Sequence, residues 1–129
     1  MKSKIILISL IYLWITVNSL FSDNVKGKVI KVISGDTFNT ETGGGLCRFY
    51  YYRAPSMKTK RGKLAKKELE KLILNKEIHA RVPADDENGY ASVSNILVYP
   101  VDFYKPETVD TILIRKKLLY QYRKRKYID

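Results

Sequence analysis

Cysteine and histidine are nearly absent from this chain of 129 residues, because each occurs once, as Cys47 and His79. A single cysteine excludes a disulfide within the chain, so Cys47 has no disulfide partner, and it excludes a zinc site built from several cysteines. We expect Cys47 to be a small buried apolar residue. One histidine excludes a multi-histidine metal site. Strand alternation places His79 beside Glu77 and Arg81 on a solvent-exposed face.

Acidic residues are scarce relative to basic ones, at 13 against 24, and the net charge is +11. Such an excess favours a polyanionic partner: nucleic acid, an acidic membrane surface or an anionic polysaccharide. Hydrophobic residues make up 45% of the chain and charged residues 29%. This balance is typical of a soluble globular protein, and the length allows one domain of ordinary size.

Long apolar runs are also rare, and the clearest one extends from Ile5 to Val17. It follows Lys2 and Lys4 and precedes small polar residues, which is the layout of a secretory signal peptide. It is shorter than the roughly 20 apolar residues of a membrane-spanning helix. We therefore expect residues 1–22 to be a signal peptide and residues 23–129 to be the exported domain, secreted or periplasmic. An uncleaved N-terminal membrane anchor is the alternative.

Within residues 23–129, β-branched residues, alternation and turn residues predict five strands and two helices. The strands are expected at Val25–Ile33, Thr37–Thr40, Leu46–Tyr52, Glu77–Val82 and Tyr90–Tyr99. Helical spacing of apolar residues predicts helices over Lys58–Asn75 and from Glu107 to about Arg125. Three strands, a helix, two strands and a helix form the order of a five-stranded Greek-key barrel of the oligonucleotide-binding (OB) type. We predict this mainly β, α+β fold with two packed helices.

Four short motifs, taken in order, resemble the staphylococcal nuclease (thermonuclease-like) family. The segment 32–37, Val-Ile-Ser-Gly-Asp-Thr, is similar to the family's strand followed by Asp-Gly-Asp-Thr, and Arg48 and Pro55 have its Arg-x6-Pro spacing. The segment 88–90, Asn-Gly-Tyr, stands where the family has Tyr-Gly-Arg, and the segment 109–118 is similar to its Val-Asn-x-x-Leu-Val-Arg-x-Gly-Leu. The resemblance covers residues 25–122 and also implies an OB-type barrel.

The resemblance implies a site for cleaving DNA and RNA, in which one Ca²⁺ is held by oxygen ligands, a Glu acts on the attacking water and two Arg side chains clamp the phosphate. Asp36 matches a metal ligand, and Arg48 matches the first clamping Arg. Four positions depart from the pattern, the first being Ser34, which stands where the family has the first Asp of Asp-Gly-Asp-Thr. Arg53 replaces a metal-binding Asp, Ser56 replaces the catalytic Glu, and Tyr90 replaces the second clamping Arg.

These departures predict that hydrolysis is lost or strongly reduced. A missing general base costs about 10²–10⁴ in rate, and a missing charge-stabilising donor costs about 10²–10³. A guanidinium at the metal position also repels a cation. Asp36 is then the remnant of a metal site and Arg48 the remnant of the phosphate clamp. No cofactor is expected, whereas an active enzyme of this family would use Ca²⁺.

The same residues suggest nucleic-acid binding instead of cleavage. Alternation puts Arg48, Tyr50 and Tyr52 on one face of their strand, with Arg53 on the other. Bases stack on tyrosine rings while a guanidinium pairs with phosphate, which suits single-stranded nucleic acid. The predicted binding residues are Arg48, Tyr50, Tyr52, Arg53 and Tyr90. The alternative is that the tyrosines pack under the helices with their hydroxyls at the surface.

Two other functions remain open at this stage. One is an active metal-dependent nuclease with a rearranged site, which would use Asp36 and an acid such as Glu41, Asp85 or Asp86. The other is a membrane-associated domain that binds polyanions and is held by residues 1–22. The basic residues clustered along 58–71 and 123–126 fit either an anionic partner or a simple solvated surface.

Overall fold

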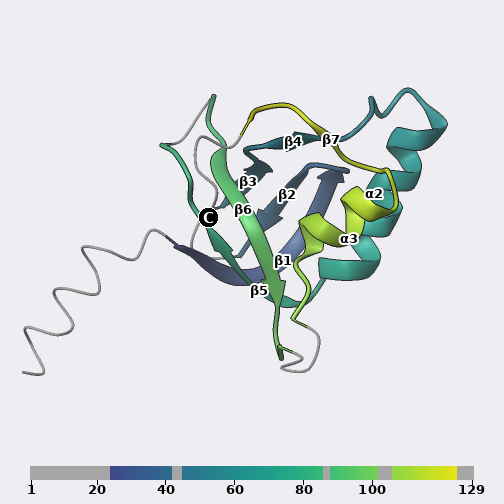
Figure 1. The fold of residues 1–129 in the computed structure, drawn as a ribbon. Helices are drawn as coiled ribbons and strands as arrows, with labels where there is room; N and C mark the ends of the chain where they lie inside the picture. Colours follow the sequence, from purple (N-terminus) through teal and green to yellow (C-terminus); the bar gives the residue numbers. More distant parts are fainter. Residues whose placement is uncertain (1–23, 42–44, 86–87, 102–105, 125–129) are drawn as a thin grey trace, which may run out of the picture.

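A computed structural model describes residues 24–41, 45–85, 88–101 and 106–124. Five strands close into a barrel in the order β1-β2-β3-β6-β5, in which only the β3–β6 pair is parallel. The barrel strands are β1 (Asn24–Ser34), β2 (Thr37–Thr40), β3 (Leu46–Phe49), β5 (Glu77–Arg81) and β6 (Ala91–Val98). The helices α2 (Lys60–Ile73) and α3 (Val109–Arg115) pack together at one side of the barrel (Figure 1). The predicted OB-type barrel with two helices is confirmed. The predicted signal peptide, residues 1–22, lies outside the described residues.

Strand β1 belongs to both halves of the barrel. Its first residues alternate strictly, so that Val25 and Val29 point into the core while Lys26 and Lys28 face solvent. A bulge between Val29 and Lys31 shifts this alternation. Up to Lys28 the strand pairs with β5, and from Val29 onward it pairs with β2. Ile30 is exposed by the alternation that precedes the bulge, and the shift then leaves Lys31 exposed and buries Val32.

Helix α2 begins at Thr59, whose hydroxyl accepts a hydrogen bond from the Gly62 amide at 3.0 Å, as an N-cap residue does. Ala65 and Leu69 lie on its buried stripe. The helix approaches the β1–β2 turn closely, since a Cβ added to Gly35 would lie 2.6 Å from the Ala65 Cβ. Glycine at this position therefore lets the helix hold the turn that carries Asp36.

The second helix is much shorter than predicted. It ends at Arg115, because Lys117 adopts a left-handed backbone conformation with φ of 59° and the Leu118 amide donates to the carbonyl of Leu113. Leu118 and Leu119 are then drawn into the core. The prediction of a longer helix was wrong because Tyr120 lies at helical spacing from Val109, Ile112 and Leu113, although it belongs to a strand. The chain instead runs on as the short strand β7 (Tyr120–Gln121).

The third predicted strand is interrupted. β3 stops at Phe49, the chain bends at residues 50–51, and a separate strand β4 (Tyr52–Arg53) pairs antiparallel with β7. The Tyr122 and Arg123 amides both donate to the carbonyl of Tyr51, at 2.7 and 3.1 Å. Strict alternation across residues 46–52 was therefore a wrong assumption, and the bend decides where the candidate site residues lie.

Two smaller expectations have different outcomes. Cys47 is completely buried in the core, as predicted. The expectation of a solvent-exposed His79 was wrong, because its side chain is half-buried and its ring lies 4.1 Å from that of Tyr99. Among the helices of the described residues, none is long and apolar enough to cross a membrane.

Candidate functional site: an arginine-lined hollow

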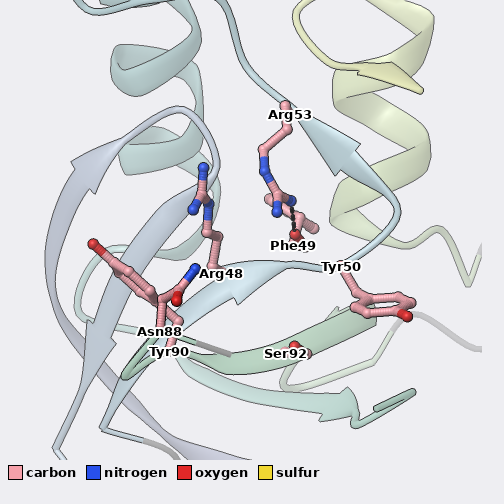
Figure 2. Close-up of a pocket in the computed structure, with 7 residues that line it drawn as sticks. All are labelled: Arg48, Phe49, Tyr50, Arg53, Asn88, Tyr90 and Ser92. Atoms are coloured by element: carbon pink, nitrogen blue, oxygen red, sulfur yellow. Dashed lines mark hydrogen bonds between the residues drawn. The ribbon is translucent and has the colours of Figure 1, made fainter. Parts of the chain in front are cut away.

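A small hollow opens where β3, the bend that follows it and the start of β6 meet. It is shallow, with about 10 Å³ of space in which the centre of a water-sized molecule can lie. Strand pairing brings the walls together, since Arg48 on β3 lies directly opposite Ser92 on β6 and opposite Thr37 on β2. Figure 2 shows the Arg48 and Arg53 guanidinium groups side by side at this place, extending from opposite directions. The lining residues are Arg48, Phe49, Tyr50, Arg53, Asn88, Tyr90 and Ser92.

Arg48 is fixed at the base of the hollow but is not fully paired. Its Cζ lies 5.5 Å from the centroid of the Tyr90 ring, which is a cation–π contact. Its Nε is buried, and no acceptor for it is found among the described residues. A buried donor without a partner is uncommon in folded proteins and costs free energy. An anion or a water in the hollow would supply the missing acceptor.

Arg53 is buried, with 8% of its surface exposed. Its Nη1 donates to the carbonyls of Phe49 and Tyr52, so the guanidinium ties the bend together. The ring of Tyr122, which follows β7, covers it at 4.3 Å. The pKa of Arg53 lies below its ordinary value, mainly because burial disfavours the charged form and next because Arg48 is close. Arg53 is nevertheless charged at neutral pH, as arginines are in proteins.

Asp36 lies close to Arg53, and its carboxylate accepts hydrogen bonds that hold neighbouring segments of the fold together. Its Oδ1 accepts from the hydroxyls of Ser34 at 2.9 Å and Thr37 at 2.8 Å, and its Oδ2 accepts from the Ala54 amide at 2.8 Å. The residue is buried, with 7% of its surface exposed. These bonds join the β1–β2 turn to the segment after β4. The negative charge also offsets part of the repulsion between the arginines, since Asp36 acts to raise the pKa of Arg53.

The residues present do not fit the calcium ion that the family resemblance implies. A hard cation takes several oxygen ligands, but both carboxylate oxygens of Asp36 already accept hydrogen bonds and a guanidinium lies close by. In the described part of the chain, no cluster of three or more His, Cys, Asp and Glu side chains is placed to hold a metal. Glu41 and Asp85 are exposed on the surface, and Asp86 lies outside the described residues.

The structure brings together four of the five predicted binding residues. Arg48, Tyr50, Arg53 and Tyr90 line the hollow, whereas Tyr52 is partly buried against the apolar core. Arg53 was expected on the opposite face from Arg48. The bend after Phe49 returns its guanidinium to the same hollow. Ser56, at the position of the family's catalytic Glu, is exposed and does not line it.

Sequence reasoning missed two residues at the rim. Tyr122 covers Arg53, and Arg123 lies over the ring of Tyr50 at 4.3 Å. Both come from a segment expected to be helical, and only the β4–β7 pairing places them here. The one available signal was the mixture of tyrosines and cations in residues 120–127. Their arrangement depends on a long-range pairing that no local pattern encodes.

Comparison with known proteins does not identify a family for this chain. No protein-family model matches the chain, and no curated protein matches its sequence.

Proposed function

We propose that this protein is a staphylococcal-nuclease-like barrel that binds nucleic acid through its phosphate groups at the Arg48–Arg53 hollow, with hydrolysis lost or strongly reduced. The observation that carries the proposal is the buried Nε of Arg48, which has no acceptor among the described residues, in a hollow whose described lining includes two arginines and no acid. A phosphate at the hollow would neutralise the two neighbouring guanidinium charges, and it would accept from the Arg48 Nε once a rotation of the side chain exposes this atom. Arg48 is also the position that matches the phosphate clamp in the family resemblance.

Nucleic acid is favoured over other polyanions because of the aromatic rings around the hollow. Tyr50 and Tyr90 line it, and Tyr122 lies at its rim with 55% of its surface exposed. Tyrosine rings offer stacking surfaces to bases, whereas a purely sulfated or carboxylated polymer has no π-face to use them. The net charge, +11 for the whole chain and +9 without Lys2 and Lys4 of residues 1–22, adds a long-range attraction for any phosphate backbone.

The test is binding of a fluorescent single-stranded oligonucleotide, followed by anisotropy over a range of salt concentrations. We expect the logarithm of the affinity to fall linearly with the logarithm of salt, as counterion release requires. Arg48→Gln should weaken binding by about tenfold or more, since hydrogen bonds to charged groups contribute about 1.5–3 kcal/mol. Arg48→Lys should recover only part of the loss, because an ammonium lacks the guanidinium fork.

Lys26→Gln is the matched control, because Lys26 is exposed on β1 outside the hollow and its loss removes the same charge. It should change the affinity by less than about twofold, as expected for one screened surface charge. Equal effects of Arg48→Gln and Lys26→Gln would mean that binding is spread over the surface. A salt slope near zero would argue against phosphate contacts altogether.

The loss of hydrolysis has its own test. Supercoiled plasmid is incubated with the protein and Ca²⁺, Mg²⁺ or Mn²⁺, and nicking is measured on a gel. We expect no metal-dependent nicking above a protein-free control. Metal-dependent nicking that disappears in Asp36→Asn, in a preparation whose circular dichroism shows the native fold, would establish an active nuclease with a rearranged site.

Export through residues 1–22 belongs to the same proposal. Expression with these residues followed by fractionation and mass determination should give an exported protein lacking them. A full-length protein in the membrane fraction would indicate an anchor instead.

A further inference from the structure

A second basic surface lies on helix α2, outside the lining of the hollow. Lys60, Lys63 and Lys67 are exposed there, and no ion pair joins any of them to an acid of the described chain. Glu68, by contrast, pairs with Lys71 at 3.3 Å and with Lys116 at 2.8 Å. Glu68 is therefore already neutralised, and Glu70 is the other acid of the helix, so lysines and arginines outnumber acids on this surface.

The end of helix α3 extends this surface. Arg61 donates to the backbone carbonyl of Lys117, while Lys116 reaches Glu68. Arg61 is three residues before Leu64 and Glu68 is four residues after it, so the two contacts lie on either side of Leu64 on one face of the helix. Leu64 is 47% exposed, and Ile114, one turn before Lys117, is 37% exposed. We call this surface the Leu64 patch: Arg61, Leu64, Lys67, Ile114, Lys116 and Lys117.

We propose that the Leu64 patch docks on a bilayer of anionic phospholipids. Exposed aliphatic side chains among lysines and arginines are the composition of helices that lie at a membrane interface, where the apolar group enters the acyl boundary and the cations meet lipid phosphates. The aliphatic members distinguish the patch from the tyrosine-lined hollow, because Leu and Ile offer bases no stacking surface. This inference is independent of the function proposed for the hollow.

The patch also has a suitable position. Helix α2 and the end of α3 form one side of the molecule, and the turn between β5 and β6 lies on the other (Figure 1). A bilayer that contacts the helices would therefore lie away from this turn, to which the exposed Asp85 belongs. This separation provides a control site on the same protein.

The test attaches an environment-sensitive fluorophore to the full chain at Leu64→Cys or, as control, at Asp85→Cys. The native Cys47 is completely buried and is protected from labelling in the folded protein. Vesicles of phosphatidylcholine alone are compared with vesicles that also contain phosphatidylglycerol. We expect a blue shift at position 64 with the anionic vesicles only, no shift at position 85, and reversal by high salt.

Three results would overturn the proposal. The first is the absence of a shift at position 64. The second is an equal shift at both positions, which would mean that another part of the chain, such as residues 1–22, brings the protein to the bilayer. The third is a shift at position 64 with oligonucleotide but not with vesicles, which would make the patch a nucleic-acid surface.

Charge variants separate this patch from the hollow. In the protein labelled at position 64, Lys67→Gln and Lys117→Gln should each lower the vesicle partition coefficient about fivefold, the factor expected for one cation near an anionic surface. Arg48→Gln should leave it unchanged while weakening oligonucleotide binding. Loss of vesicle binding in Arg48→Gln, or none in the two lysine variants, would contradict the assignment.

Discussion

The ring of Tyr122 lies over the guanidinium of Arg53, with 4.3 Å between the ring centroid and Cζ. Strand β4 carries the cation, and the residue after β7 carries the ring, so the contact joins two segments that are distant in the sequence. Arg53 also holds the bend through the carbonyls of Phe49 and Tyr52. Arg53 is thus part of the framework of the fold.

Removal of the Tyr122 ring should lower stability. A desolvated cation–π contact contributes about 0.5–2 kcal/mol, so Tyr122→Ala is expected to reduce the free energy of unfolding by about 1 kcal/mol, while Tyr122→Phe keeps the native value. Urea denaturation measures both. Tyr120→Ala, at an equally exposed position of β7, is the control and should cost less. A Tyr122→Phe loss as large as that of Tyr122→Ala would show that the hydroxyl, not the ring, matters.

Asp36 should matter for folding even in the absence of any metal. Asp36→Asn removes the charge and replaces one acceptor oxygen with a donor, so either the Ala54 amide loses its partner or the Ser34 and Thr37 hydroxyls must accept where they now donate. We expect a loss of about 2–3 kcal/mol in the free energy of unfolding, the range for hydrogen bonds to a charged group. Equilibrium urea denaturation without divalent ions tests this. Glu41→Gln, an exposed carboxylate, should be nearly neutral.

We predict that Gly62→Ala lowers the stability of the protein, although helix propensity alone predicts an increase. Alanine is normally preferred to glycine inside a helix by about 1 kcal/mol. A Cβ at position 62, however, would lie 1.9 Å from the backbone oxygen of Ser56, so the helix start would have to move. Gly62→Ala should destabilise the protein by about 1–3 kcal/mol, as overpacking does. Lys63→Ala, at the exposed neighbouring position, should not; stabilisation by Gly62→Ala would refute the close approach.

His79 predicts a pH dependence of stability. Its pKa is lowered from the ordinary value of 6.5, first by burial and then by Lys26, with Glu77 opposing. The unfolded chain takes up a proton on His79 more readily than the folded chain does. The contribution of His79 to the free energy of unfolding is therefore complete above about pH 6.5 and is lost as the pH falls toward the lowered pKa. Comparing unfolding at pH 7.5 and at pH 5 should show a smaller loss in His79→Asn than in the native protein. An identical loss in both proteins would assign the pH dependence to other groups.

The barrel could be predicted because its strands obey local rules. Val25 and Val29 alternate with lysines on β1, and Ala65, Leu69 and Ile73 recur at helical spacing on α2. These periods follow from backbone geometry alone. The end of α3 could not be predicted in the same way, because the left-handed turn at Lys117 uses a residue with no special preference for it.

The candidate site was predictable only in part, and for a similar reason. The residues Arg48 and Tyr90 meet because neighbouring barrel strands align them, which the resemblance had already suggested. Arg53 and Tyr122 meet because the chain bends after Phe49 and pairs again with a distant segment. Bends and short pairings of this kind depend on the balance of many tertiary contacts, and a one-residue change of register reverses which face a side chain occupies.

The shared strand β1 also affects how the molecule can open. Its first residues hydrogen-bond to β5 and its last to β2, so neither half of the barrel can separate without loosening the same strand. Amide hydrogens along β1, β2 and β5 should consequently exchange with deuterium at similar rates, as one cooperative unit. The two-residue strands β4 and β7, which stand outside the closed barrel, should exchange earlier by local fluctuation.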